Sequence, residues 1–379
     1  MRTFYDIAGQ YASLLLVGSI AAISWHTWRT WRLELTSMAE PQSGAGPVID
    51  EWPAQPHVSI LVAAWNETAN IEAFIESFLR LSYPHKELVL CAGGNDGTYE
   101  LARLYASEQI ILLEQAAGEG KQRALQRCLP ASAGSIIMLT DADCELSDLA
   151  FYELLQPLVS GKTLVATGVS EPKMQQRTIP LVQYQWFTDH WWAARMPPTV
   201  DGVLGRNCAI ERSILTDIGA FDAEVRTGTD YHLSRLLIQA GYSISAIPQS
   251  RVLTEYPASP RDYVRMWRRW NKNLLIHGLR FGAWGDVKGV LTAFLVYSFM
   301  FLAPFATLFF GPLLMIPAVI LYCLALGQRL RRVLTGARLA RVETPWRCIL
   351  ILPFLTILDA LAVVRAFIDT VRWRTRLQW

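Results

Sequence analysis

The sequence has few cysteines and almost no net charge. Its six cysteines stand far apart without a CxxC pair, so they suit neither a zinc site nor a disulfide framework. Separated thiols of this kind are typical of a reducing compartment. The formal net charge of +2 over 379 residues provides no basic field of the kind that binds nucleic acid. We therefore expect no nucleic-acid partner.

Charged residues are also missing from two long stretches, Ile7–Trp25 and Gly289–Gly327. The first is long enough to cross a bilayer, and the Trp/Arg-rich collar that follows suits the membrane interface. Because no clean small-residue cleavage site follows it, a retained helix is favoured over a signal peptide. The second stretch would measure about 58 Å as one helix, nearly twice a hydrocarbon core. We expect it to form a hairpin of two spans divided at Gly311-Pro312.

A third apolar run, Cys348–Phe367, contains Asp359 and Arg365. It could span with an inward Asp or lie partly in the interface. The basic loop before it, 329–347, favours a cytoplasmic side. Upstream, apolar residues of the segment 261–284, among them Trp267 and Trp270, fall at helical spacing and are flanked by Arg and Lys, which is typical of a basic amphipathic helix at a membrane surface.

These patterns divide the chain into five parts. We expect an N-terminal transmembrane helix, a Pro/Gly-rich linker, a cytosolic α/β domain, amphipathic interface helices and a C-terminal transmembrane region, at 1–32, 33–56, 57–257, 258–285 and 286–379. The protein is thus expected to be a multi-pass membrane protein whose central domain faces the cytosol.

Strand and helix patterns alternate in the central domain. Short apolar runs near 58–63, 87–91, 109–113 and 136–139 predict strands, and helical spacing fills the intervals between them. Short connections between alternating elements predict a parallel sheet with helices on both faces. Ligands of such sheets bind beyond the carboxyl ends of the strands.

The fourth of these runs ends in two carboxylates, Asp141 and Asp143. Positions i and i+2 of an extended segment share a face, so both side chains can converge on one ion. Oxygen-only ligands favour Mg²⁺ or Mn²⁺ over zinc. The alternative is an ordinary strand end followed by an Asx turn.

Two glycine-rich loops are weaker signals. Gly93-Gly94 permits either close approach of a ligand or a tight turn. Lys121 follows Gly118 and Gly120 at a helix start, where an anion is favoured, although a solvated surface lysine has the same pattern. The spacing GxxxxGK[ST] is absent, which excludes a Walker P-loop.

Taken in order, seven motifs carry a family resemblance: AAWNE at 63–67, CAGGNDGT at 91–98, GKQRAL at 120–125, TDAD at 140–143, GRN at 205–207, TD at 229–230 and RW at 269–270. The set resembles the membrane-bound family 2 glycosyltransferases, which include ceramide glucosyltransferases, hyaluronan synthases and cellulose synthases. The resemblance covers residues 57 to about 275. It implies a Rossmann-like nucleotide-sugar-binding domain of the GT-A type, flanked by transmembrane helices.

The resemblance also implies roles for individual residues. Asp143 would hold Mg²⁺ or Mn²⁺ on the diphosphate of the sugar nucleotide, and Asp141 would lie near the nucleotide or metal. The nucleotide would be lined by Ala64, Asn66, Glu67, Gly93 and Lys121. Residues near the diphosphate or acceptor would be Gly205, Arg206, Asn207, Arg269 and Trp270. Asp230 would be the general base that accepts the proton of the acceptor hydroxyl; its position before a helix is equally that of an N-cap.

The motifs depart from the family pattern in three places. Cys91 and Ala92 stand where the family usually has acidic residues that contact the base or ribose. The Gln of the family's Gln-x-x-Arg-Trp is absent before Arg269-Trp270. The acidic pair before the acceptor helix is reduced to Asp230.

The sequence therefore predicts an inverting, metal-dependent transfer of sugar from a nucleotide-sugar donor, first of all a UDP-sugar, to a membrane-associated lipid or lipid-linked acceptor. One alternative is a processive polysaccharide synthase. Another is a catalytically silent membrane sensor that binds a nucleotide, which Cys91-Ala92 would favour and the retained aspartates oppose. A phosphatase with a DxD strand end would leave Lys121 and Arg269-Trp270 unexplained.

Overall fold

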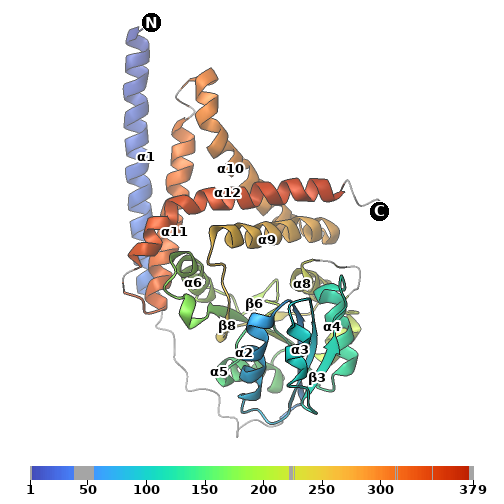
Figure 1. Cartoon of the computed structure of the whole chain (residues 1–379). Helices are drawn as coiled ribbons and strands as arrows, with labels where there is room; N and C mark the ends of the chain where they lie inside the picture. Colours follow the sequence, from blue (N-terminus) through green and yellow to red (C-terminus); the bar gives the residue numbers. More distant parts are fainter. Residues whose placement is uncertain are drawn as a thin grey trace. The chain divides into compact units, whose positions relative to one another are not determined.

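The computed structural model describes residues 2–37, 55–221, 225, 227–311, 313, 315–343 and 345–374 (Figure 1). The chain forms two compact units. We call Ser43–Gln176 with Trp192–Tyr256 the sheet unit, and Met1–Gln42, Arg177–Trp191 and Pro257–Trp379 the helical unit. Most of the predicted linker at 33–56 lies outside the described residues.

The sheet unit is built on one eight-stranded sheet of order β3-β2-β1-β4-β7-β5-β8-β6. The strands are β1 Val58–Trp65, β2 Lys86–Gly93, β3 Ile110–Glu114, β4 Ile136–Leu139, β5 Val165–Pro172, β6 Thr199–Val200, β7 Cys208–Glu211 and β8 Ile244–Thr254. The pairs β1–β2, β2–β3 and β1–β4 are parallel, as predicted.

Beyond β4 the sheet is mixed, so the prediction of an all-parallel sheet is wrong there, although β5 and β8 still pair parallel. Strand β7 runs antiparallel to both β4 and β5, and β6 runs antiparallel to β8. Strand β7 therefore begins where β4 ends, with Cys208 paired to Leu139. This reversal brings the loop that precedes β7 to the carboxyl end of β4.

Two helical layers cover the sheet, as predicted. Alternate residues of β1 explain this: Val58, Ile60 and Val62 belong to the core beneath α2 Thr68–Leu79, α3 Thr98–Arg103 and α5 Asp148–Val159. Leu61 belongs to the opposite core, beneath α4 Gly120–Ala131, α7 Arg212–Asp217 and α8 Thr229–Gln239. A strand buried on both faces needs a continuous apolar run, which is what the sequence of β1 shows. A short 3₁₀ turn, η2 Met174–Gln176, follows β5.

The helical unit contains α1 Arg2–Ser37, most of α6 Pro180–Ala193, α9 Pro260–Phe281, α10 Trp284–Phe310, α11 Met315–Leu339 and α12 Trp346–Arg374 (Figure 1). The predicted amphipathic segment is α9, which ends at Gly282 in a left-handed conformation with φ of 66°. Helix α6 contributes Trp186 and Phe187 to this unit's core. Helix α6 packs so closely on α11 that a Cβ at Gly336 would lie 1.9 Å from the Phe187 carbonyl oxygen.

Two helices of the described chain are long and apolar enough to cross a membrane, Trp284–Phe309 and Trp346–Arg372. Large apolar side chains such as Phe305 and Leu308 are exposed on the first of them. Exposed apolar surface of this kind suits contact with lipid. The spanning roles of α1 and α11 stay predictions.

The acidic residue of the last apolar run points inward. Asp359 on α12 accepts hydrogen bonds from Arg329 Nη2 of α11 at 2.6 Å and from the Tyr263 hydroxyl of α9 at 2.8 Å. Arg329 also donates to the Thr356 hydroxyl. The structure thus pairs Asp359 inward across three helices, and the position of this run in the membrane stays a prediction.

Candidate active site

The loops after β1 and β2 interlock at the carboxyl edge of the sheet. Asn66 adopts a left-handed conformation with φ of 57°, and its Oδ1 accepts a hydrogen bond from Asn95 N at 2.9 Å. Asn66 N donates to the Gly93 carbonyl at 3.1 Å. A Cβ at Gly94 would lie 2.2 Å from Asn66 Oδ1, so only glycine fits there. The structure thus brings Asn66 and Gly93 together, while Ala64 is fully buried in the sheet.

Asp96 holds the same two loops together and was not singled out from the sequence. Its carboxylate accepts hydrogen bonds from Thr98 Oγ1 at 2.6 Å, Thr98 N at 3.1 Å and Thr68 N at 3.1 Å. The hydrogen bond from the Thr98 hydroxyl is the main cause that lowers the pKa of Asp96. The Asn-Asp-Gly-Thr motif, which is typical of an Asx turn, was the signal available.

Three predicted residues from distant segments meet at the end of β4. Lys121, at the start of α4, forms an ion pair with Asp141. Arg206 Nε, in the loop before β7, lies 3.9 Å from Asp141 Oδ2. The Thr140 hydroxyl donates to the Arg206 carbonyl at 2.9 Å, which fixes that loop to β4. We call Lys121, Asp141, Asp143 and Arg206 the DxD cluster.

The charges of the DxD cluster perturb one another. Burial raises the pKa of Asp143 and the Asp141 carboxylate raises it further, against the opposing effect of Arg206. Burial alone would lower the pKa of Arg206, but Asp141 and Asp143 outweigh it, so this pKa is raised. Burial and the Asp141 carboxylate together thus outweigh the opposing effects of Arg206 and Lys121 on the pKa of Asp143, and a further cation would stabilise its charged form.

These residues suit a divalent cation whose coordination is completed by the phosphates of a ligand. Among the described residues, no group of three His, Cys, Asp or Glu side chains is placed to hold a metal. Asp141 and Asp143 supply two carboxylates instead. Mg²⁺ in phosphate sites is commonly held by one or two carboxylates, with substrate phosphates and water as the other ligands.

Glu67 lies near this cluster. Its carboxylate accepts a hydrogen bond from Asn70 Nδ2 at 3.1 Å. Burial is the main cause that raises the pKa of Glu67, and the nearby Asp143 and Asp141 carboxylates add to it. Glu67 thus lies within electrostatic reach of both aspartates, and its part in a nucleotide site stays a prediction.

Asp230 borders the same site. A Cβ at Gly205 would lie 2.9 Å from Asp230 Cβ, so the two predicted positions are in contact. Burial lowers the pKa of Lys121, but the carboxylates of Asp141 and Asp230 outweigh burial and raise it. The N-cap of α8 is Gly228, with φ of 73°, and Asp230 lies in the first turn. The N-cap interpretation of Asp230 is therefore wrong.

Asn207 is directed into the protein. It is fully buried, and its Nδ2 donates to the carbonyls of Val169 at 2.9 Å and Ser250 at 3.1 Å. A Cβ at Gly168 would lie 2.2 Å from this nitrogen. The side chain of Asn207 thus anchors the loop that carries Gly205 and Arg206.

Arg269 and Trp270 lie on α9 in the helical unit. The Trp270 ring packs edge-on against Trp267, with centroids 5.2 Å apart. Their part in the site stays a prediction.

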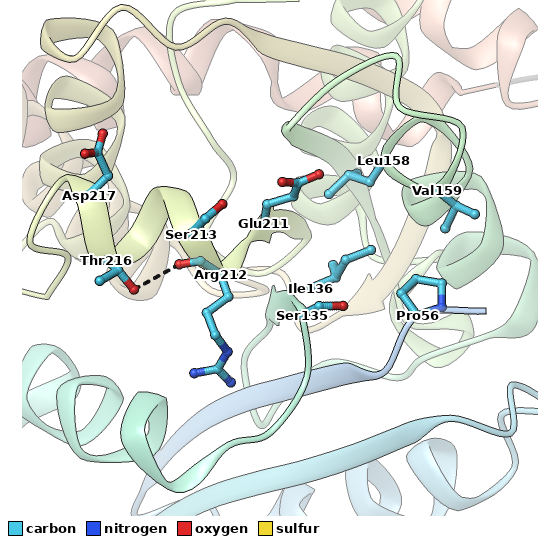
Figure 2. A pocket seen from close by; sticks show the side chains of 10 residues that line it. All are labelled: Pro56, Ser135, Ile136, Leu158, Val159, Glu211, Arg212, Ser213, Thr216 and Asp217. Carbon is cyan, nitrogen blue, oxygen red and sulfur yellow. Dashed lines mark hydrogen bonds between the residues drawn. The ribbon is translucent and has the colours of Figure 1, made fainter. Parts of the chain in front are cut away.

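A large cavity of about 840 Å³ lies at the opposite end of β4 (Figure 2). Ser135 and Ile136, at the amino end of the strand, line it together with Glu211. The neighbouring Arg212 guanidinium donates to the Gly134 carbonyl at 2.6 Å and to Ser132 Oγ at 2.6 Å, so it serves the fold. Because the aspartates lie at the other end of the strand, we do not assign the active site to this cavity.

Comparison with known proteins agrees with this geometry. The probable glycosyltransferase YdaM of Bacillus subtilis is 25% identical over 235 residues, which are 57% of this chain and 54% of that protein. The poly-beta-1,6-N-acetyl-D-glucosamine synthase of Staphylococcus aureus is 23% identical over 198 residues, 50% of this chain and 48% of the synthase. The chain therefore spans about half the length of these two relatives.

A solved structure matches nearly the whole chain. The mannosyltransferase PcManGT from Pyrobaculum calidifontis, solved with GDP-Man and Mn²⁺, aligns over 95% of this chain and 97% of its own, with a TM-score of 0.52 and 17% identity. This likeness confirms the GT-A fold. The family model described as "Glycosyltransferase like family 2" matches residues 55–273. With the sheet and the DxD cluster in place, the chain belongs to glycosyltransferase family 2.

Proposed function

We propose that this glycosyltransferase moves a sugar, with inversion and with the help of a divalent cation, from a nucleotide diphosphate to a membrane-associated lipid or lipid-linked acceptor. The observation that carries the proposal is the DxD cluster, in which Lys121, Asp141 and Arg206 come from three separate segments and meet at one strand end. Their location at the carboxyl edge of a largely parallel half-sheet is where such folds bind ligands.

The DxD cluster suits a diphosphate. Asp143, with Asp141, would hold Mg²⁺ or Mn²⁺, which would neutralise charge on the departing diphosphate. Lys121 and Arg206 would bind the phosphate oxygens directly, since both cations already face the aspartates. The PcManGT structure was solved in complex with GDP-Man and Mn²⁺, which supports this class of donor and metal.

The nucleobase needs a different contact from the one usual in the family. Cys91 and Ala92 are fully buried in β2, so neither side chain reaches a ligand. Glu67 and the backbone of the 93–95 turn remain beside the site to contact the nucleoside. The family resemblance makes UDP-sugars the first donors to test, and GDP-sugars the second.

Asp230 suits the role of general base. It lies next to Gly205 and near Lys121, yet belongs to α8 rather than to the DxD strand end. The acceptor oxygen would attack C1 of the donor sugar while the bond from C1 to the phosphate oxygen breaks. The hydroxyl proton would pass to the Asp230 carboxylate. A single displacement of this kind inverts the configuration at C1.

The helical unit supports the proposal that the acceptor carries a lipid. Helices α10 and α12 are long and apolar enough to cross a membrane, and α9 carries Arg and Trp residues beside them in the chain. An acceptor held in the same membrane would meet the enzyme in two dimensions. The sheet unit would then face the cytosol, where nucleotide sugars are available.

The deciding experiment measures hydrolysis and transfer with the detergent-purified full chain. UDP-, GDP- and other nucleotide sugars are each supplied with Mn²⁺, with or without a polyprenyl phosphate or a glycerolipid as acceptor. We expect turnover of one donor, loss of turnover in EDTA and an inverted product anomer. Asp217→Asn, in the cavity at the far end of β4, is the matched control and should retain turnover. Nucleotide binding without turnover would instead support the silent sensor.

A second candidate is processive polysaccharide synthesis. The similarity to the Staphylococcus aureus synthase favours it, although only about half of that protein is covered. Product length separates the two candidates. A single added sugar supports the lipid-acceptor enzyme, whereas a ladder of long products supports the synthase.

A further inference from the structure

A buried lysine lies in the sheet unit outside the family motifs. Lys173 directly follows β5 and is only 4% exposed. Its backbone N–H donates to the Thr254 carbonyl at 3.1 Å, at the end of β8. Lysine is rarely buried to this degree unless its charge is paired. The groups that contact this ammonium therefore indicate the role of Lys173.

The Lys173 ammonium reaches across the sheet to the first helix of the unit. Its Nζ donates to Asn70 Oδ1 at 3.0 Å, in the first turn of α2. Strands β5 and β1 are separated in the sheet by β4 and β7, so this bond connects two distant edges of the active site. Two carboxylates also lie near the ammonium: Glu145 Oε1 at 3.7 Å and Glu255 Oε1 at 4.0 Å.

Asn70 connects Lys173 to Glu67 through its side-chain amide. Its Nδ2 donates to Glu67 Oε2 at 3.1 Å. An ammonium only donates and a carboxylate only accepts, so the Asn70 amide can satisfy both neighbours in one orientation alone. Reversing the amide would place like partners against each other at both ends. The hydrogen bonds therefore run in one direction only, from the buried Lys173 through Asn70 to Glu67.

The same chain affects the charge balance beside the DxD cluster. Glu67 lies near the carboxylates of Asp143, Asp141 and Glu255, each of which raises its pKa in addition to burial. The positive charge of Lys173 lies behind Asn70, close to Glu145 and Glu255. This charge therefore compensates the carboxylates of Glu145 and Glu255, while the hydrogen bonds through Asn70 orient Glu67.

We propose that Lys173 is a positioning residue for the donor: through Asn70 it holds the Glu67 carboxylate in the orientation that binds the nucleoside of the sugar nucleotide. Lys173 itself does not touch the donor. This inference rests on the proposed donor site, because it assigns Glu67 to the nucleoside. It predicts that loss of Lys173 weakens nucleotide binding more than it slows the transfer step.

The test measures nucleotide binding and steady-state kinetics on the full-length protein in detergent. UDP and GDP, each with Mn²⁺, are the binding probes. For Lys173→Met we expect Kd of the bound nucleotide and KM of the donor to rise about tenfold or more, the size of one charge-assisted hydrogen bond. We expect kcat to change by less than about threefold, since this interaction is made equally in the ground and transition states. Lys162→Met, at an exposed lysine of the same unit, is the matched control and should behave as wild type.

Two further variants separate positioning from general stability. Asn70→Ala should reproduce the rise in Kd, and the double variant Lys173→Met/Asn70→Ala should be little worse than either, because both changes cut the same chain. Lys173→Arg keeps the charge and a donor, so it should recover part of the affinity. If Lys173→Met does not fold, Asn70→Ala and Lys173→Arg still test the chain.

Three results would overturn the inference: wild-type Kd in Lys173→Met, equal losses in kcat and kcat/KM, or full additivity in the double variant. Failure of the proposed function looks different. In that case the wild-type protein itself would bind neither UDP nor GDP, whatever the variants do.

Discussion

The two units each contain a cluster of opposite charges, and the clusters differ in how far they are closed. In the sheet unit the side chains of Lys121 and Asp141 are 35% and 29% exposed. In the helical unit the side chains of Arg329 and Asp359 are 6% and 18% exposed, and hydroxyls of Tyr263 and Thr356 supply further hydrogen bonds. The first cluster is open to a ligand, whereas the second is completed by the protein itself.

The two ion pairs have different roles because they are buried to different degrees. A buried charge pair gains little net stability, because desolvation offsets the attraction, but removing one partner is costly. Arg329 and Asp359 thus tie α11 to α12 and, through Tyr263, to α9. In the DxD cluster, burial and the Asp141 carboxylate instead raise the pKa of Asp143, which agrees with the site proposed for a cation and a diphosphate.

The largest expected effect is on turnover through Asp230, the carboxylate at the edge of the open cluster. Asp230→Asn keeps the size of the side chain but cannot accept the proton. We expect turnover to fall by about 10²–10⁴ while nucleotide affinity changes little. Single-turnover kinetics with the active donor checks this. Near-normal turnover would place the base elsewhere, and loss of folding would make the residue structural.

For the buried pair of Arg329 and Asp359, we expect a large effect on stability instead. Asp359→Ala leaves the Arg329 guanidinium buried without its carboxylate, which typically costs about 3–5 kcal/mol. Thermal unfolding in detergent should show a clear loss of stability. The paired change Asp359→Leu/Arg329→Met removes both charges and should be much milder. Equal loss in the single and double variants would contradict the contrast between the clusters.

The prediction of a metal concerns the DxD cluster alone. Asp143→Asn removes one of the two carboxylates, and we expect donor turnover to fall by about 10²–10³ with weaker binding of the nucleotide-metal complex. Chelation by EDTA should abolish wild-type activity, and Mn²⁺ or Mg²⁺ should restore it. Neither change should alter the unfolding of the helical unit. Full activity in EDTA would refute a metal at Asp141 and Asp143.

The smallest effect is a pH dependence from Asp96, which joins the loops beside the open cluster. The pKa of Asp96 is lowered in the folded protein, chiefly by the Thr98 hydroxyl. Its ionised form therefore stabilises the fold above the unfolded pKa near 3.8, and this contribution is lost as the pH falls. Thermal unfolding of wild type and Asp96→Asn should differ by a constant amount between about pH 5 and 8 and converge in acid. A difference that grows in acid would reverse the sign.

The sequence supported prediction of the first half of the sheet unit. Apolar runs such as Ile136–Leu139 predict buried strands because both faces of a central strand must be covered. Local chemistry also predicted that Asp141 and Asp143 follow such a strand. The second half was harder, because β6 and β7 follow each other with no helix between them, and nothing local shows that β7 runs antiparallel.

The family resemblance, the carboxylate pair and the apolar helices could be predicted from the sequence, because each motif or run consists of neighbouring residues. Tertiary structure alone decided which charges face each other. Lys121 reaches Asp141 across 20 residues, and Arg206 reaches it from the loop before β7. Lys173 reaches Asn70 across 103 residues, and Arg329 reaches Asp359 across 30. Electrostatic energy depends on distance in space and on burial, and neither quantity is local in the sequence.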